Sequence, residues 1–249
     1  MLNTVAVTVA AVTAFPIFWM VVSALPVGNF RRVLTVDSFA LYFLNSAVVA
    51  IVVVVASGLL AFLAAVALTR FHFRFRTTIL VLFLIAQMAP VEALTIPPFF
   101  LVRDLGALNT LASLMLVHTA FTLPFAIWMM RGFVAAVPAE IEEAAALDGA
   151  GRLTILYRVL FPLVAPGLAA TSVFSFITAW NDFLFARTFI ISATDRQTLP
   201  LALLIFFKPD ENDWGAIMAA STLMTVPVLV FFLLVRRHLA GGLGGAVKD

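Results

Sequence analysis

The sequence has no cysteine and few charged residues, which make up 11% of its 249 residues. Without cysteine, neither a disulfide nor thiol chemistry can be argued. The three histidines, at positions 72, 118 and 238, lie far apart without metal-ligand spacing, so no metal site is predicted. Lys208 and Lys248 are the only lysines, and no Gly-x-x-x-x-Gly-Lys-Ser/Thr phosphate loop occurs. The net charge of +2 is too small to indicate a nucleic-acid partner.

Apolar residues are abundant instead. They form 63% of the chain, and the mean hydropathy is +1.13, whereas a soluble domain is only about half apolar and roughly a quarter charged. A membrane-spanning helix needs ~20 apolar residues. Six windows qualify, at about 2–25, 44–68, 78–102, 108–130, 164–187 and 215–235. We therefore expect an all-α integral membrane protein with about six transmembrane helices, forming a single domain over residues 1–249.

Two windows have unusual features. The first is longer than a signal-peptide core and lacks a clear cleavage site, so we expect a retained span. No basic residue precedes it, and the completeness of the N-terminus is left open. The third contains Pro90, Glu92, Pro97 and Pro98, which predicts a kink. A break within a membrane is tolerated where protein, rather than lipid, covers the freed backbone groups.

The basic residues predict the orientation, because cytoplasmic loops carry an excess of arginine and lysine. With both termini inside, the cytoplasmic face receives nine basic residues: Arg70, Arg74, Arg76, Arg131, Arg152, Arg158, Arg236, Arg237 and Lys248. The outer face receives six: Arg31, Arg32, Arg103, Arg187, Arg196 and Lys208. This bias predicts that the N-terminus and the C-terminus are both cytoplasmic.

Residues 132–163 interrupt the apolar sequence with a charged segment, "PAEIEEAAALDGAGRLTILYRVLFP". Pro138 suits a first helical turn, and the glutamates that follow it favour the positive end of a helix dipole. The alanine run predicts a helix that stops at Gly149 and Gly151, where a left-handed backbone is allowed. A second helical piece, Arg152 to Leu160, is expected to end at Pro162. The physical pattern alone fits an ordinary surface loop and a docking segment equally well.

The stretch "EAAALDGAGRLTILYRVLFP" resembles the EAA loop of ABC-type import permeases. That pattern is Glu-Ala-Ala, three residues, Gly, nine residues, then Ile-x-Leu-Pro. It falls here on Glu143, Ala144, Ala145, Gly149, Val159, Phe161 and Pro162. Valine for isoleucine is a mild change, and phenylalanine for leucine is a departure that keeps a bulky apolar residue.

The resemblance extends to "PFFLVRDLGALNTLASLMLVHTAFTLPFAIWMMRGF" and "FSFITAWNDFLFA", which are similar to the carbohydrate-uptake branch with the maltose and glycerol-phosphate permeases. It implies the permease subunit of an ATP-driven importer in a bacterial plasma membrane, not an enzyme. The implied partners are a second permease subunit in a heterodimer, two cytoplasmic ATPase subunits that bind ATP and magnesium, and an external solute-binding protein. It also implies that residues 132–163, here called the coupling loop, dock on an ATPase subunit. The coupling residues it implies are Glu143, Ala144, Ala145, Asp148, Gly149 and Pro162.

Four polar or aromatic residues within the windows are candidates for the substrate pathway: Glu92, Trp180, Asn181 and Asp182. A buried carboxylate in a membrane is costly, so Glu92 either faces the pathway or is protonated or bonded to Gln87 or Thr95. Trp180 with its two neighbours could hold a sugar by stacking and hydrogen bonds. The alternative, which we favour, is a tryptophan anchor at the membrane interface, with Asn181 and Asp182 capping the backbone or bonding a facing subunit. His118 and Asn45 are expected to bond between helices.

Two other classes of protein compete with this interpretation. An ion-coupled secondary transporter would need two related halves and several buried ionisable groups, but the halves of this chain are unrelated. A membrane-embedded enzyme would need a cluster of His, Asp or Ser, and none is visible. The substrate is not determined: a mono-, di- or oligosaccharide, a sugar alcohol or a glycerol phosphate ester would each suit the family branch.

Overall fold

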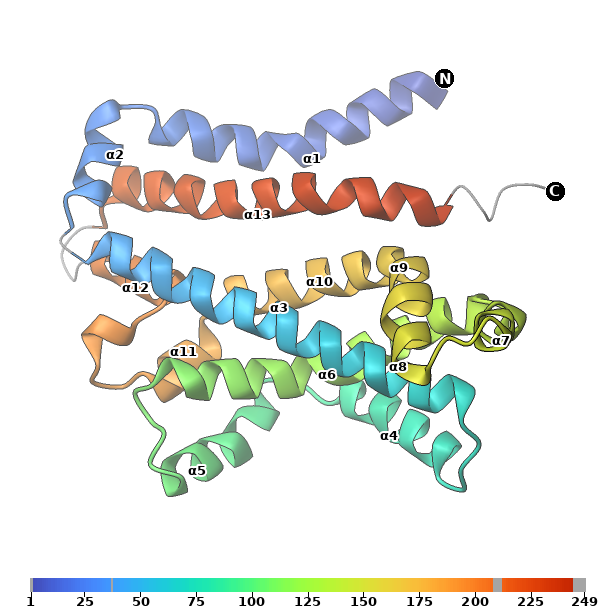
Figure 1. Ribbon diagram of the computed structural model, residues 1–249. Helices are drawn as coiled ribbons and strands as arrows, with labels where there is room; N and C mark the ends of the chain where they lie inside the picture. The colour runs from blue at the N-terminus through green and yellow to red at the C-terminus, as the bar shows by residue number, and fades with distance from the viewer. Residues whose placement is uncertain (1, 37, 208–211, 244–249) are drawn as a thin grey trace.

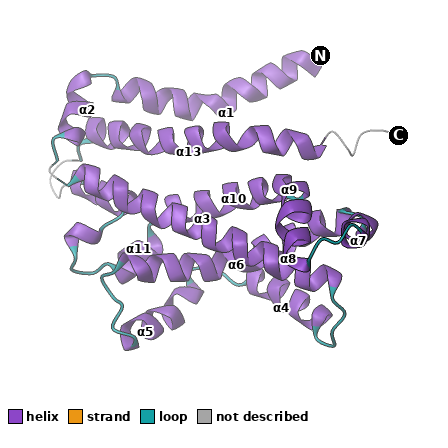
Figure 2. Cartoon of the chain, in the orientation of Figure 1, coloured by secondary structure: helices purple, strands orange, loops and turns teal. Residues whose placement is uncertain are grey.

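The computed structural model describes residues 2–36, 38–207 and 212–243, and these form helices joined by short loops, with no strand in those ranges (Figures 1 and 2). Four helices are long and apolar enough to cross a membrane, and two bent helix pairs raise the number to as many as six. The four are α1 (Leu2–Ala24), α3 (Phe39–Arg70), α6 (Leu111–Ala136) and α13 (Trp214–Leu243). The prediction of an all-α membrane protein is confirmed.

The third predicted window is broken rather than kinked. It forms α4 (Arg76–Met88), a short 3-10 turn, η1 (Ala93–Thr95), and α5 (Ile96–Asp104), and the two halves meet at 114°. Pro90 explains the break, because it pushes the preceding Ala89 to an extended backbone, with φ −76° and ψ 137°. Two further prolines lie in the first turn of α5, where their missing N–H groups leave no gap.

The fifth predicted window, 164–187, is wrong as one continuous helix. It contains α10 (Ala165–Trp180) and a separate short helix, α11 (Leu184–Phe189). The break needs no proline. The carboxylate of Asp182 accepts hydrogen bonds from the backbone N–H groups of Phe185 (3.1 Å) and Ala186 (2.9 Å), so it starts a new helix in the manner of an N-cap.

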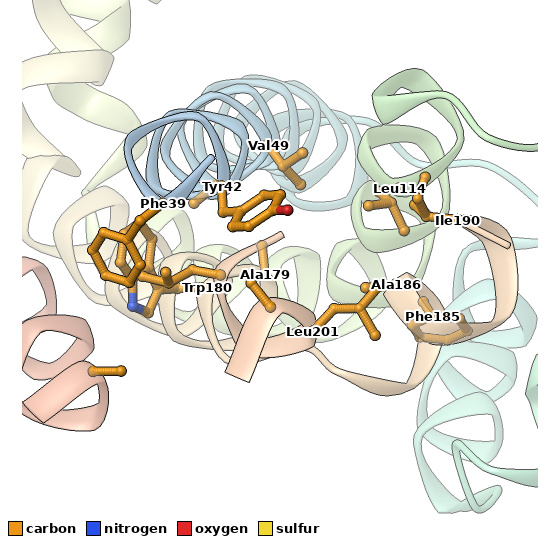
Figure 3. Packing of buried hydrophobic residues seen from close by; sticks show 14 of the residues in the cluster. Phe39, Tyr42, Val49, Leu114, Ala179, Trp180, Phe185, Ala186, Ile190 and Leu201 are labelled. Atoms are coloured by element: carbon orange, nitrogen blue, oxygen red, sulfur yellow. The ribbon is translucent and has the colours of Figure 1, made fainter. Parts of the chain in front are cut away.

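The core lies where α3 packs against α6 and α10, and α10 in turn packs on α13. Figure 3 shows Ala179 and Trp180 of α10 facing Phe39 and Tyr42 of α3. Small residues allow close packing: a Cβ atom on Gly167 of α10 would lie 2.5 Å from the ring of Phe133 on α6. By contrast, α1 packs mainly on α13 and exposes nearly all of its apolar side chains.

One end of the bundle carries the start of α1, the end of α13 and α7 (Ala139–Leu147), as Figure 1 shows. The other end carries α2 (Val27–Leu34), α12 (Leu199–Ala202) and the 3-10 turns η3 (Thr194–Arg196) and η4 (Leu203–Phe206). The first and the last described residues of the chain, at the start of α1 and the end of α13, therefore lie at the end that holds the coupling loop. Which end faces the cytoplasm stays a prediction, and Lys208 and Lys248 lie outside the described residues.

Candidate functional site: the coupling loop and the broken spans

The first half of the coupling loop is the helix α7. Pro138 precedes it as the N-cap, with φ −58° and ψ 135°, one position earlier than predicted. Glu140 and Glu142 lie in the first turn, where the helix dipole favours negative charge. Glu143, the first residue of the family pattern, is exposed. The helix therefore displays one of its central glutamates to solvent.

Gly149 ends α7 in the left-handed conformation, with φ +84°. The turn is closed by three backbone hydrogen bonds of 3.0 Å, in which the N–H groups of residues 148, 149 and 150 donate to the carbonyls of Ala144, Ala146 and Ala145. This is the glycine C-cap that satisfies the last carbonyls of a helix, as predicted. The similar prediction for Gly151 is wrong, since its φ of −67° and ψ of 158° are open to any residue.

The second half of the coupling loop is a continuous helical piece of mixed winding. It consists of α8 (Arg152–Thr154), a π-helical turn, η2 (Ile155–Leu160), and α9 (Phe161–Leu163). The predicted end at Pro162 is wrong. Pro162 lies inside this continuous piece, directly after the π-helical turn, and the chain bends two residues later, at Val164. There the piece meets α10 at 72°.

Beside its exposed charges, the outer surface of the coupling loop carries strongly exposed apolar side chains. Leu147 is 90% exposed beside the Gly149 turn, and Leu153 beyond it is 74% exposed. Ala144 and Ala146 are also exposed, whereas Ala145 is half-buried. Small side chains next to projecting leucines form a surface that another protein can approach closely.

Arg70, the last residue of α3, holds the inner side of α7, and the sequence analysis missed this role. Its Nε donates to Oε1 of Glu142 over 2.7 Å, and its Nη2 donates to the carbonyl of Val137 over 2.8 Å. The two charged side chains are 18% and 21% exposed. No local pattern could pair residues so far apart in the sequence, although a basic residue closing a long span was a visible signal.

The break between α4 and α5 borders an open pocket of about 320 Å³. Most of its lining is apolar, and its polar side chains are Gln87, His118, Thr122 and Thr178. Glu92 lies at the break and is exposed. It does not form the predicted bonds, because Gln87 donates to the carbonyl of Phe121 (3.4 Å) and Thr95 to that of Val91 (3.0 Å).

Asp182 is held from two sides. Besides capping α11, its Oδ2 lies 3.3 Å from Nε2 of His118, and the two side chains are 10% and 2% exposed. Capping of the backbone is what the structural interpretation of Asp182 predicted, and His118 contacts the residue that caps α11 across two elements. Among the described residues, His118 Nδ1 is buried without a hydrogen-bond partner.

Trp180 is neither an interfacial anchor nor open to a solute, because it is only 1% exposed. Its Nε1 donates to the carbonyl of Met224 over 3.1 Å, and its ring stacks on Phe176 and meets the edge of Phe43. Asn181 is exposed at the end of α10 and lines a second pocket of about 290 Å³. The four pathway candidates are therefore not one cluster.

Asn45 on α3 donates to the carbonyls of Asp195 and Gln197, both at 2.9 Å, and so ties the core to the loop at η3. Within the part of the chain that the structure describes, no group of three or more His, Cys, Asp or Glu could hold a metal ion.

Comparison with known proteins identifies the family of the chain. Residues 57–244 match the family described as binding-protein-dependent transport system inner membrane component. The diacetylchitobiose uptake system permease protein DasC of Streptomyces coelicolor is 39% identical, over 99% of this chain and 96% of its own. The trehalose/maltose transport system permease protein MalG of Thermococcus litoralis is 32% identical, over 98% and 94%.

Among solved structures, a chain of a bacterial ABC transporter involved in the import of the acidic polysaccharide alginate has a similar fold. The TM-score is 0.80 with 21% sequence identity, and the match covers 95% of this chain and 94% of that one. At 21% sequence identity, this similarity shows a shared fold and nothing about the substrate.

Proposed function

The chain belongs to the family of binding-protein-dependent transport system inner membrane components, and from this premise we propose that it moves a saccharide across a bacterial plasma membrane. It is a multi-pass membrane protein and a transport subunit rather than an enzyme. The proposed cycle is alternating access, driven by ATP that separate subunits bind with magnesium and hydrolyse. The observation that carries the proposal is the exposed turn at Gly149, which presents α7 at one end of the bundle.

The coupling loop supports docking of an ATPase subunit. The small side chains of the exposed Ala144 and the half-buried Ala145 allow another protein to approach closely. Leu147 projects far enough to enter an apolar cleft, and Glu143 offers a charge to a basic residue of the partner. Asp148 and Gly149 form the turn behind these contacts. Pro162 precedes the 72° bend by two residues and so belongs to the connection with the membrane helix α10. The motion of the ATPase subunits reaches the spans through this connection.

The broken spans favour a second permease subunit on one face of this chain. A break at membrane depth frees backbone N–H and C=O groups, and lipid cannot satisfy them. The face that carries Glu92 is therefore covered by another protein or by water in the assembled transporter. A heterodimer with the solute pathway between its subunits meets both conditions.

Within this pathway Glu92 and Asn181 are the candidates for substrate contact, since both side chains are exposed. Trp180 and Asp182 lie behind that surface and hold α10 and α11 in place through their own bonds. Their part in transport is to fix the shape of the pathway wall.

The names of the relatives favour a saccharide as substrate, because diacetylchitobiose and trehalose or maltose are the solutes of two of them. A sugar alcohol or a glycerol phosphate ester is the alternative within the same family. For either class of solute, the proposal requires an external solute-binding protein that delivers the solute. It also places the coupling loop and both termini in the cytoplasm.

The test is purification of this chain with its partner permease, its ATPase and its solute-binding protein, followed by reconstitution in liposomes. Diacetylchitobiose, maltose, trehalose and glycerol 3-phosphate serve as probes. We expect one of the saccharides, with the binding protein, to stimulate ATP hydrolysis and to be taken up. Uptake that follows an ion gradient and needs no nucleotide would establish a secondary transporter and refute the proposal.

A further inference from the structure

We propose that Arg70 is a positioning residue that fastens the coupling helix α7 to the ends of α3 and α6. The three elements then move as one body when an ATPase moves the coupling loop. We call the two contacts of Arg70, with the Glu142 carboxylate and the Val137 carbonyl, the Arg70 bridge. The inference rests on the proposed function, because it concerns how motion at α7 reaches the membrane helices.

The Arg70 bridge joins three elements through one guanidinium group. Arg70 ends α3, Val137 is the C-cap residue of α6, and Glu142 lies in the first turn of α7. The carbonyls at a helix C-terminus lack partners within the helix and carry the negative end of its dipole. A guanidinium presents several donors in a fixed plane, so it binds this carbonyl and the Glu142 carboxylate together.

The connectivity of the chain shows why such a contact matters. α7 follows α6 directly and reaches α10 through α8, η2 and α9, but it has no short covalent link to α3. Yet α3 is the helix on which both α6 and α10 pack. Among the described residues of α7, Glu142 is the one whose side chain hydrogen-bonds outside the helix. The Arg70 bridge is therefore a direct polar connection from α7 to the central helix.

The neighbouring residues Glu142 and Glu143 have different roles. Adjacent residues on an α-helix point about 100° apart. Glu142 turns inward and is 21% exposed, whereas Glu143 is exposed to solvent. One glutamate thus holds α7 to its own chain, and the other is free for a partner. Arg74, which follows α3 by four residues and is exposed, provides a matched control for Arg70.

The experiment measures the separation between α7 and α3. The chain has no native cysteine, so Ala139→Cys on α7 and Leu63→Cys on α3 can carry the only two spin labels in the chain. Distances are recorded in the assembled transporter in nanodiscs, without nucleotide and after trapping with ATP and vanadate. In the otherwise unmodified chain and in Arg74→Gln, we expect one narrow distance that does not change on trapping.

In Arg70→Gln we expect a second, longer distance on trapping. Losing a charge-assisted bond shifts the ratio of attached to released α7 by about tenfold. Glu142→Gln keeps the contact of Arg70 with the Val137 carbonyl, so a smaller fraction of α7 should be released. This variant replaces Arg70→Gln in the experiment if Arg70→Gln does not fold. Arg70→Lys keeps the charge but not the planar fork, and an intermediate result is expected.

Two results would overturn the proposal: a distance in the unmodified chain that changes on trapping as much as in Arg70→Gln, or an Arg70→Gln distance that stays narrow. Failure of the proposed function is seen separately. If no ATPase subunit co-purifies with the unmodified chain, the docking role of the coupling loop is wrong. In the isolated chain, a broader distance distribution in Arg70→Gln than in the unmodified chain then still shows that the Arg70 bridge holds α7 to α3, and equal distributions refute it.

Discussion

Replacing Gly149 with valine is the most direct test of the coupling loop. The backbone there has φ +84°, and apart from its two neighbours in the chain a Cβ atom would meet nothing within 4 Å. Any effect within this chain therefore comes from backbone strain and not from a clash. A side chain held in a sparsely populated region costs about 1–3 kcal/mol, and β-branched residues are among the worst suited.

The strain acts on the end of α7. With about 2 kcal/mol of strain, the native turn loses roughly thirtyfold in population against conformations that release the three hydrogen bonds of the C-cap. We expect Gly149→Val to lower uptake and stimulated ATP hydrolysis by at least tenfold, while the amount of protein in the membrane stays the same. Uptake in reconstituted liposomes and immunodetection in membranes measure the two quantities.

Two further variants separate conformation from bulk. Gly151→Val places the same side chain two residues away, at φ −67°, where it costs no strain and also meets open space. Gly149→Asn adds bulk but tolerates the left-handed conformation. We expect both to retain most of the activity. Equal losses in Gly149→Val and Gly151→Val would refute the strain argument, and normal uptake in Gly149→Val would refute the role of the turn itself.

Three other predictions test the fold around the site. Asp182→Ala should lower the stability of the purified protein by about 2 kcal/mol in thermal unfolding, because two backbone N–H groups of α11 lose their acceptor, and Asp182→Asn should lose less. Gly167→Ala should destabilise by about 1–3 kcal/mol because its methyl group overlaps a ring on α6, whereas Gly132→Ala, which meets open space, should not. For the orientation, Leu147→Cys should react with a membrane-impermeant maleimide only in inside-out vesicles and Ser192→Cys only in right-side-out ones; the reverse pattern would invert the assigned topology.

The sequence predicted the features that depend on local composition. A membrane span is a run of apolar residues, so five of the six windows correspond to long helices or to the bent pair of α4 and α5. The exception is 164–187, where α10 forms a bent pair with the piece that begins at Arg152 and not with α11. The C-cap at Gly149 was also predictable, because a glycine that follows a run of helix-forming residues has few other roles. Pro90 predicted that the third span is interrupted, although not by how much.

The features that were missed depend on contacts between distant segments. The pair of Arg70 and Glu142 exists only because α3 and α7 meet at one end of the bundle. The burial of Trp180 follows from the packing of α10 on α3 and α13, which no local pattern encodes. The break before α11 was missed because a side chain, Asp182, competes for the backbone there, and hydropathy does not record such competition.

The π-helical turn at residues 155–160 gives the connection between the Gly149 turn and α10 a property that a plain α-helix lacks. Its bonds run from each N–H to the carbonyl five residues earlier, so the turn holds more residues than an α-turn. An α-helix turns about 100° for each residue. If the π-helical turn became α-helical by releasing one extra residue, the chain beyond it would rotate about the helix axis by about this angle. A change in the winding of this segment would therefore turn the chain that leads into α10 about its axis, in addition to any change in the 72° bend.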